Sequence, residues 1–118
     1  MTAELSPIQA VPIEKRILTI RGERAILDLD LAELYGVTTK ALNQAVKRNT
    51  ERFPSNFAFF LSNTEKAEVV TTCDHLRRLK FSPVLPRAFT EHGAIMAATV
   101  LNSPRAVQMS LYIRKRQK

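Results

Sequence analysis

The side chains best suited to chemistry in this sequence lie in one short segment, residues 39–49. If that segment is a helix with about 100° between successive residues, its apolar residues share one face and its polar residues lie opposite them. Asparagine and glutamine amides can pair with the edge of adenine, and lysine can reach guanine or a phosphate group. The segment therefore predicts a base-reading helix, with an ordinary solvated helix face as the alternative. The side chains assigned to base reading are Thr39, Lys40, Asn43, Gln44 and Lys47.

The net charge of the chain supports the same interpretation. Eighteen Lys and Arg stand against 11 Asp and Glu, which gives +7, and the surplus is largest in residues 81–118. Because each Lys or Arg near a phosphate releases condensed counterions, a basic domain favours a polyanionic partner. The residues expected to contact DNA phosphates are Arg48, Arg52, Arg114, Lys115 and Arg116.

Other kinds of chemistry have little support in the sequence. The single cysteine, Cys73, and the two histidines, His75 and His92, form no clear cluster with metal-ligand spacing. Cys73 as a nucleophile has only His75 nearby as a base, which is thin support. With only three glycines, the chain has no glycine-rich phosphate loop. We therefore expect no enzyme activity, no catalytic residues, no metal, no cofactor and no small-molecule substrate. We assign no role to His92 or to residues 70–84.

Cysteine content and hydropathy bear on the location of the protein. One cysteine rules out a disulfide within the chain, which agrees with a reducing cytoplasm. The longest apolar-rich stretch, residues 94–101, is too short to cross a bilayer. We expect a cytoplasmic protein with no membrane partner.

Two helices are predicted to hold the base-reading face. Asp28 and Asp30 favour a helix start, with Glu33 as capping-box partner of Asp30, so the first helix should cover residues 29–35. Gly36 should end it in the left-handed conformation. The second helix, capped by Thr38 or Thr39, then runs to Asn49, and the small Ala32 allows the two helices to cross closely. Residues 28–49 are thus expected to form a helix-turn-helix.

The remaining elements are predicted from turn residues and caps. Two β-branched-rich runs around Gly22-Glu23 predict a hairpin over residues 17–27. The aromatic run 57–61 predicts a strand that is buried on at least one side, and a core role for Phe57, Phe59 and Phe60 is favoured over a base-stacking platform. Further elements are expected at residues 63–75 (a helix started by Ser62 and Glu65), 77–86 (a loop), 87–90 (a strand), 91–101 (a helix capped by Thr90) and from Pro104 onward (a last helix).

Four motifs follow one another along the chain: IRGERAILDLDLAELYGV at residues 20–37, TKALNQAVKRN at 39–49, RFPSNFAF at 52–59 and LPRAFTEHG at 85–93. In this order they resemble the phage KilA-N superfamily, in its Orf-six N-terminal branch, over residues 13–111. The resemblance implies a small α+β domain of phages and phage-derived bacterial genes that binds DNA. It also implies a place at the N-terminus of antirepressor-like proteins. The family often has glutamine where this chain has His92.

These observations together predict a small α+β helix-turn-helix domain with a short N-terminal β-hairpin and additional strands and helices. Residues 13–118 would form this domain after a flexible arm at 1–12, as the N-terminal part of a longer protein. The expected function is that of a sequence-specific, double-stranded-DNA-binding regulatory domain of phage antirepressor type, in the cytoplasm of a bacterial or phage-infected cell. The alternative is a protein-interaction module that binds a repressor or another partner. A repressor protein or a second copy of the chain is left open as a partner in either case.

Overall fold

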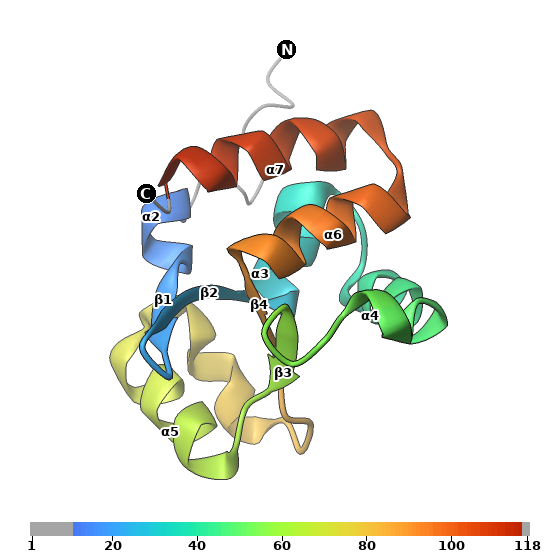
Figure 1. The fold of residues 1–118 in the computed structure, drawn as a ribbon. Coiled ribbons are helices and arrows are strands. Elements are labelled where there is room, and N and C mark those ends of the chain that lie inside the picture. The colour runs from blue at the N-terminus through green and yellow to red at the C-terminus, as the bar shows by residue number, and fades with distance from the viewer. Residues whose placement is uncertain (1–10, 117–118) are drawn as a thin grey trace.

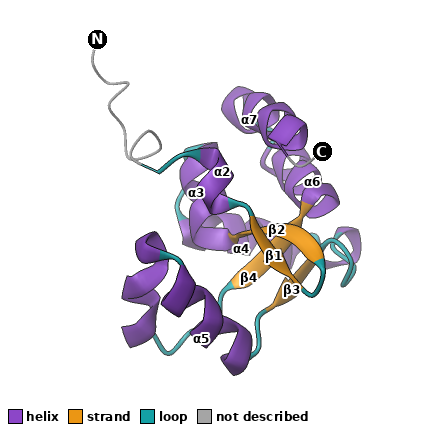
Figure 2. Cartoon of the chain, turned by 90° about the vertical axis from the view of Figure 1, so that its left-hand side faces the viewer, coloured by secondary structure: helices purple, strands orange, loops and turns teal. Residues whose placement is uncertain are grey.

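A four-stranded antiparallel sheet lies at the centre of the structure, with helices on both of its faces (Figures 1 and 2). The structure is a computed structural model that describes residues 11–116, so most of the predicted arm at 1–12 lies outside the described residues. The strands are β1 (Leu18–Ile20), β2 (Glu23–Leu27), β3 (Ala58–Phe60) and β4 (Arg87–Thr90), in the order β1-β2-β4-β3. The longer helices are α3 (Asp28–Tyr35), α4 (Thr39–Arg48), α5 (Asn63–Thr72), α6 (Glu91–Leu101) and α7 (Pro104–Arg116). The short ones are α2 (Ile13–Arg16) and the 3-10 helices η2 (Thr50–Arg52) and η3 (Asp74–Phe81). The α+β class is confirmed.

The predicted N-terminal hairpin is present as β1 and β2. Ile20 pairs with Glu23 across a two-residue turn, Arg21-Gly22. Both turn residues have positive φ, at 56° and 78°, which is the conformation that matches the twist of a tight hairpin. Strand β4 then pairs with β2 and carries β3 on its other side, so β1 and β3 form the two edges of the sheet.

The sheet separates two apolar clusters. The larger one lies between the sheet and α3, α4, α6 and α7, and includes the fully buried Ile26, Leu31, Leu42 and Phe89. Tyr35 belongs to it, and its hydroxyl donates to the carbonyl of Ala94 at 2.7 Å. The smaller cluster lies on the other face of the sheet, under α5 and η3.

The predicted helix pair forms α3 and α4, although the start of α3 differs from the prediction. Gly36 adopts the left-handed conformation at φ 74°, and the side chain of Thr38 caps α4 by accepting from the amide of Ala41. The predicted capping box is wrong, because β2 runs directly into α3 and Leu27 occupies the N-cap position without a side-chain cap. Asp30 and Glu33 instead bind Arg16, which is described below.

Local signals predicted most of the remaining elements. The capping box of Ser62 and Glu65 is present at the start of α5, Thr90 caps α6, and Ser103 accepts from the amide of Ala106 at the start of α7. Three expectations were wrong. The segment expected to be a loop contains η3, helix α5 ends at Thr72, and Phe60 on β3 is 54% exposed rather than buried.

Candidate nucleic-acid interface

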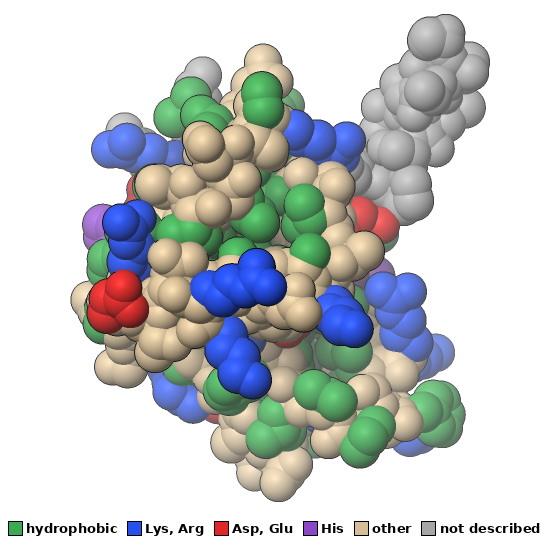
Figure 3. Space-filling view, turned by 90° about the vertical axis from the view of Figure 1, so that its right-hand side faces the viewer, with side chains coloured by type: hydrophobic (Ala, Val, Ile, Leu, Met, Phe, Trp, Pro, Cys, Tyr) green, Lys and Arg blue, Asp and Glu red, His purple; other side chains and the backbone are tan. Residues whose placement is uncertain are grey.

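Helix α4 carries an exposed cationic face at the side of the molecule. Leu42 and Val46 are buried against the larger apolar cluster, while Lys40, Gln44 and Lys47 are exposed. No acidic residue occurs in α4. Figure 3, which views the side on which α4 lies, shows Lys and Arg side chains across the middle of this face. Gln44 therefore presents an amide to solvent between two lysines.

The structure corrects the placement of Asn43, which is half-buried and not exposed on the outward face. Thr39, which the sequence also assigns to base reading, is half-buried as well. The sequence predicts a buried stripe of Ala41, Leu42, Ala45 and Val46, whereas only Leu42 and Val46 are buried within α4. The centre of the observed buried face therefore lies about 50° around the helix from the predicted centre, and Asn43 falls at the boundary between the buried and exposed faces.

Asn43 makes a structural contact at this boundary. Its amide nitrogen donates to Oδ2 of Asp28 at 2.9 Å, and its amide oxygen is buried without a hydrogen-bond partner among the described residues. Asp28 is buried at the first position of α3, where it follows β2 directly. The contact thus fixes α4 against the junction of β2 and α3, and it orients the helix that carries the exposed face.

Arg87 of β4 is a second neighbour of Asp28. The ladder pairs Leu27 with Ala88, which places Asp28 beside Arg87 at the end of the sheet. Burial lowers the pKa of Arg87, and the carboxylate of Asp28 opposes this change. The guanidinium carbon of Arg87 lies 4.4 Å from the centroid of the Phe60 ring. No local sequence pattern predicts that Asp28 and Arg87 are neighbours, because the pairing of β2 with β4 brings them together from distant parts of the chain.

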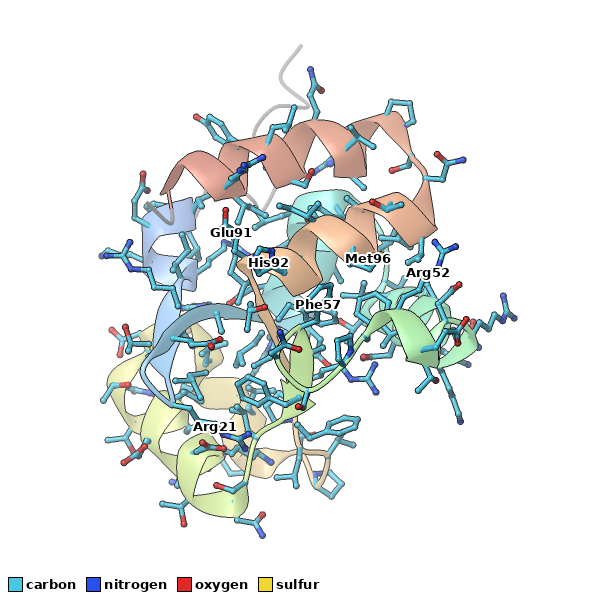
Figure 4. The ribbon with its side chains drawn as sticks, viewed as in Figure 1. Arg21, Arg52, Phe57, Glu91, His92 and Met96 are labelled. Atoms are coloured by element: carbon cyan, nitrogen blue, oxygen red, sulfur yellow. The ribbon has the colours of Figure 1, made fainter. Side chains whose placement is uncertain are left out.

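The predicted phosphate-binding residues fall into two separate groups. Arg48 and Arg52 are exposed at the end of α4 and on η2, and Arg52 points outward in Figure 4. Arg114 lies near the C-terminal end of α7, across the molecule from α4, where it pairs with Glu91 at 3.6 Å (Figure 1). The side chains of Lys115 and Arg116 lie outside the described part of the chain. Arg48 and Arg52 therefore lie close to the exposed face of α4, whereas Arg114 lies on the opposite side of the molecule.

A buried ion cluster, not foreseen from the sequence, holds α3 in place. Arg16 of α2 is 1% exposed and donates to Oδ1 of Asp30 at 3.0 Å and to Glu33. His75 of η3 lies 2.8 Å from the second carboxylate oxygen of Asp30. Burial raises the pKa of Asp30, while the hydrogen bond to His75 and the charge of Arg16 act in the opposite direction. In the sequence, the only indication of this cluster is the pair of carboxylates Asp30 and Glu33, three residues apart on α3, which favours a nearby cation.

Aromatic residues fasten the loop before β3 to α6. Phe57 stacks on His92 with ring centroids 5.6 Å apart, and Figure 4 shows the pair together with Met96 where that loop meets α6. Gly93 makes the approach possible, since a Cβ there would lie 1.9 Å from the carbonyl oxygen of Phe57. His92 thus has a packing contact, and the expected core role of the aromatic run holds for the half-buried Phe57 and Phe59 but not for Phe60.

Two further features concern metal binding and membrane insertion. Among the described residues, no group of three or more His, Cys, Asp and Glu side chains is placed to hold a metal ion. Within residues 11–116, no helix combines the length and the apolar character that crossing a membrane requires.

Comparisons with known proteins gave one match. Residues 15–100 match the family model of the ORF6N domain, which covers most of the chain. No curated protein and no solved structure matches.

Proposed function

The chain belongs to the ORF6N domain family, a phage-associated family, and we propose that it is a regulatory domain that binds double-stranded DNA through α4. The observation that carries the proposal is the exposed face of α4, where Lys40, Gln44 and Lys47 stand together with no acidic residue on the helix. The major groove of B-DNA is wide enough to admit such a helix. In this proposal α3 and α4 act as a helix-turn-helix, and the family match gives independent support for a phage-type regulatory role.

The residues of this face take different roles in the proposal. Gln44 lies at the centre of the outward face, so its amide would read a base edge, with Lys40 and Lys47 reaching guanine or flanking phosphates. Arg48 and Arg52 would hold the DNA backbone, because they follow the reading residues at the end of the helix. Asn43 would act as a positioning residue, since its amide is engaged with Asp28. Thr39 is half-buried at the first turn of α4, and in this proposal the rest of its side chain would contact a base edge.

Fluorescence anisotropy with labelled duplexes tests the proposal. A preferred site is first obtained by selection from a random-sequence duplex library. Affinity for DNA should then fall by about tenfold or more between 50 and 200 mM salt if several phosphates are contacted. No saturable binding at 50 mM salt would refute DNA binding.

Two variants and a control separate reading from positioning. Gln44→Ala should cost about 1–3 kcal/mol on the preferred site and little on random DNA. Arg48→Ala should weaken binding to all sequences alike and reduce the salt slope by about one. The control is Lys15→Ala, which removes one exposed cation from α2, across the molecule from α4 (Figure 1). Equal losses from Arg48→Ala and Lys15→Ala would show that net charge, not α4, determines binding.

A second candidate function is protein docking through α7. Val107 and Leu111 are 48% and 57% exposed and lie four residues apart on one side of that helix, while Tyr112, 45% exposed, lies about 100° further round it. An apolar stripe of this kind is typical of a surface that meets another helix. Leu111→Ser should then abolish association with a repressor or with a second copy, measured by sedimentation, and leave the DNA affinity unchanged. If the Leu111→Ser variant associates as strongly as the wild-type protein, this candidate function is refuted.

A further inference from the structure

A basic hollow lies between α5 and η3, on the face of the sheet opposite the larger apolar cluster. Its volume is about 600 Å³, and Lys66, Arg77 and Lys80 contribute to its lining together with Asn63. No carboxylate lines it. Neither the sequence motifs nor the proposed role of α4 uses these residues.

The three cations are held together by the fold. Lys66 projects from α5 and its ammonium donates to the backbone carbonyl of Ser82, just after η3, so it is fixed between the two elements. Arg77 and Lys80 are three residues apart in a 3-10 helix, which has three residues per turn, and therefore lie on the same side of η3. The two elements thus direct their positive charges into one space.

The charge of the hollow is not balanced from within. Arg77 pairs with Asp74 at 3.1 Å, but the two side chains are 71% and 94% exposed, and water screens a pair of this kind strongly. That pair also uses one nitrogen of a guanidinium that has five N–H donors. Like charges gathered in one hollow repel one another, and a bound anion relieves that repulsion.

We propose that this hollow binds a phosphate group. Guanidinium and ammonium groups are the side-chain donors that recognise phosphate, the first as a fork and the second as a point charge. Asn63 adds an amide that can donate to a phosphate oxygen. The phosphate belongs either to a free phosphorylated molecule or to a nucleic-acid backbone. The site is independent of α4, so it stands or falls separately from the proposed DNA reading.

Pyrophosphate is the probe for the first experiment. Titration into the isotope-labelled protein, followed by nuclear magnetic resonance, should give saturable shifts of backbone amides in residues 63–71 and 77–82. Arg77→Gln and Lys80→Gln should each weaken binding by about fivefold or more, as expected for loss of a charge-assisted hydrogen bond. The matched control is Arg78→Gln, because Arg78 is an exposed arginine of the same segment that does not line the hollow. Circular-dichroism melting verifies that all three variants are folded.

The outcomes decide both the site and the source of the phosphate. Absence of saturable shifts, or an equal loss from Arg78→Gln, would overturn the proposal, because binding would then follow general charge. If Arg77→Gln and Lys80→Gln weaken the binding of duplex DNA and of pyrophosphate by similar factors, the site binds a nucleic-acid backbone. If they weaken the binding of pyrophosphate alone, the site binds a free phosphorylated molecule. Pyrophosphate binding that persists when α4 variants abolish DNA binding would support the hollow as a separate site.

Discussion

Replacing Gly93 by alanine should destabilise the protein strongly, although the same change in a helix ordinarily stabilises by about 0.5–1 kcal/mol. Gly93 lies in the first turn of α6, and an added Cβ would come 1.9 Å from the carbonyl oxygen of Phe57 and 2.7 Å from its carbon. Those are backbone atoms, which cannot rotate away as the end of a side chain can. The loop before β3 must therefore move.

The cost of that movement follows from what the loop holds. The carbonyl of Phe57 accepts from the amide of Thr90 at 3.0 Å and lies 3.2 Å from the Thr90 hydroxyl. Overpacking costs about 1–3 kcal/mol, and each hydrogen bond lost adds about 0.5–1.5 kcal/mol. After the helix preference of alanine is subtracted, the free energy of unfolding of Gly93→Ala should fall by about 1–5 kcal/mol. Since the melting temperature of a domain of this size falls by about 4 °C per kcal/mol lost, it should drop by about 4–20 °C.

Urea unfolding monitored by circular dichroism measures this loss, and Gly22→Ala is the matched control. Gly22 has φ 78° and nothing within 4 Å of an added Cβ, so that change should cost only the left-handed strain of about 1–2 kcal/mol. A Gly93→Ala variant as stable as the parent would show that α6 and the Phe57 loop do not approach as described, and the reasoning would fail.

Three further predictions concern the elements around α4 and the hairpin. Gly36→Val should lower the free energy of unfolding in urea by about 1–3 kcal/mol, because a β-branched residue is strained at φ 74°; an unchanged midpoint would contradict the left-handed turn. Asn43→Ala should cost about 1–3 kcal/mol in the same assay by removing the donor that Asn43 supplies to Oδ2 of Asp28, while Gln44→Ala, on the exposed face, should stay within about 0.5 kcal/mol of the parent. The hydrogen bonds of Arg21 and of the Ser62 amide lower the pKa of Glu65 to about 2, so the stability it adds is present above the ordinary glutamate range and is lost as the pH falls towards 2. Arg21→Gln should reduce this loss between pH 6 and pH 3, and an unchanged pH dependence of the urea midpoint would refute the assignment.

The sequence predicted elements well where the signal was local. Thr38, Ser62 and Thr90 each cap the helix expected of them, because a cap needs only its own side chain and an amide two or three residues away. The same holds for Gly36, whose conformation ends α3. Such interactions are complete within one turn of chain, so the order of residues is enough to find them.

Predictions failed where a partner came from a distant segment. The sequence predicts a capping role for Asp30, but Asp30 binds Arg16 and His75, which lie 14 and 45 residues away. Asn43 was placed on the outward face, because the helical wheel alone does not show that Asp28 stands beside it. Lys40, Gln44 and Lys47 are exposed as predicted. Their outward placement required only that the opposite face of α4, with Leu42 and Val46, be buried.

The division of the apolar interior by the sheet has a consequence for how the molecule opens. The cluster under α5 and η3 has seven buried residues among those described, against 15 in the cluster that holds α3, α4, α6 and α7. The side with the smaller cluster has less apolar contact to lose, so it should open first as a cooperative unit while the larger side remains folded. Amide hydrogens of α5 should then exchange with solvent faster than those of α6. An anion held between α5 and η3 would slow that exchange, because it binds only the closed form.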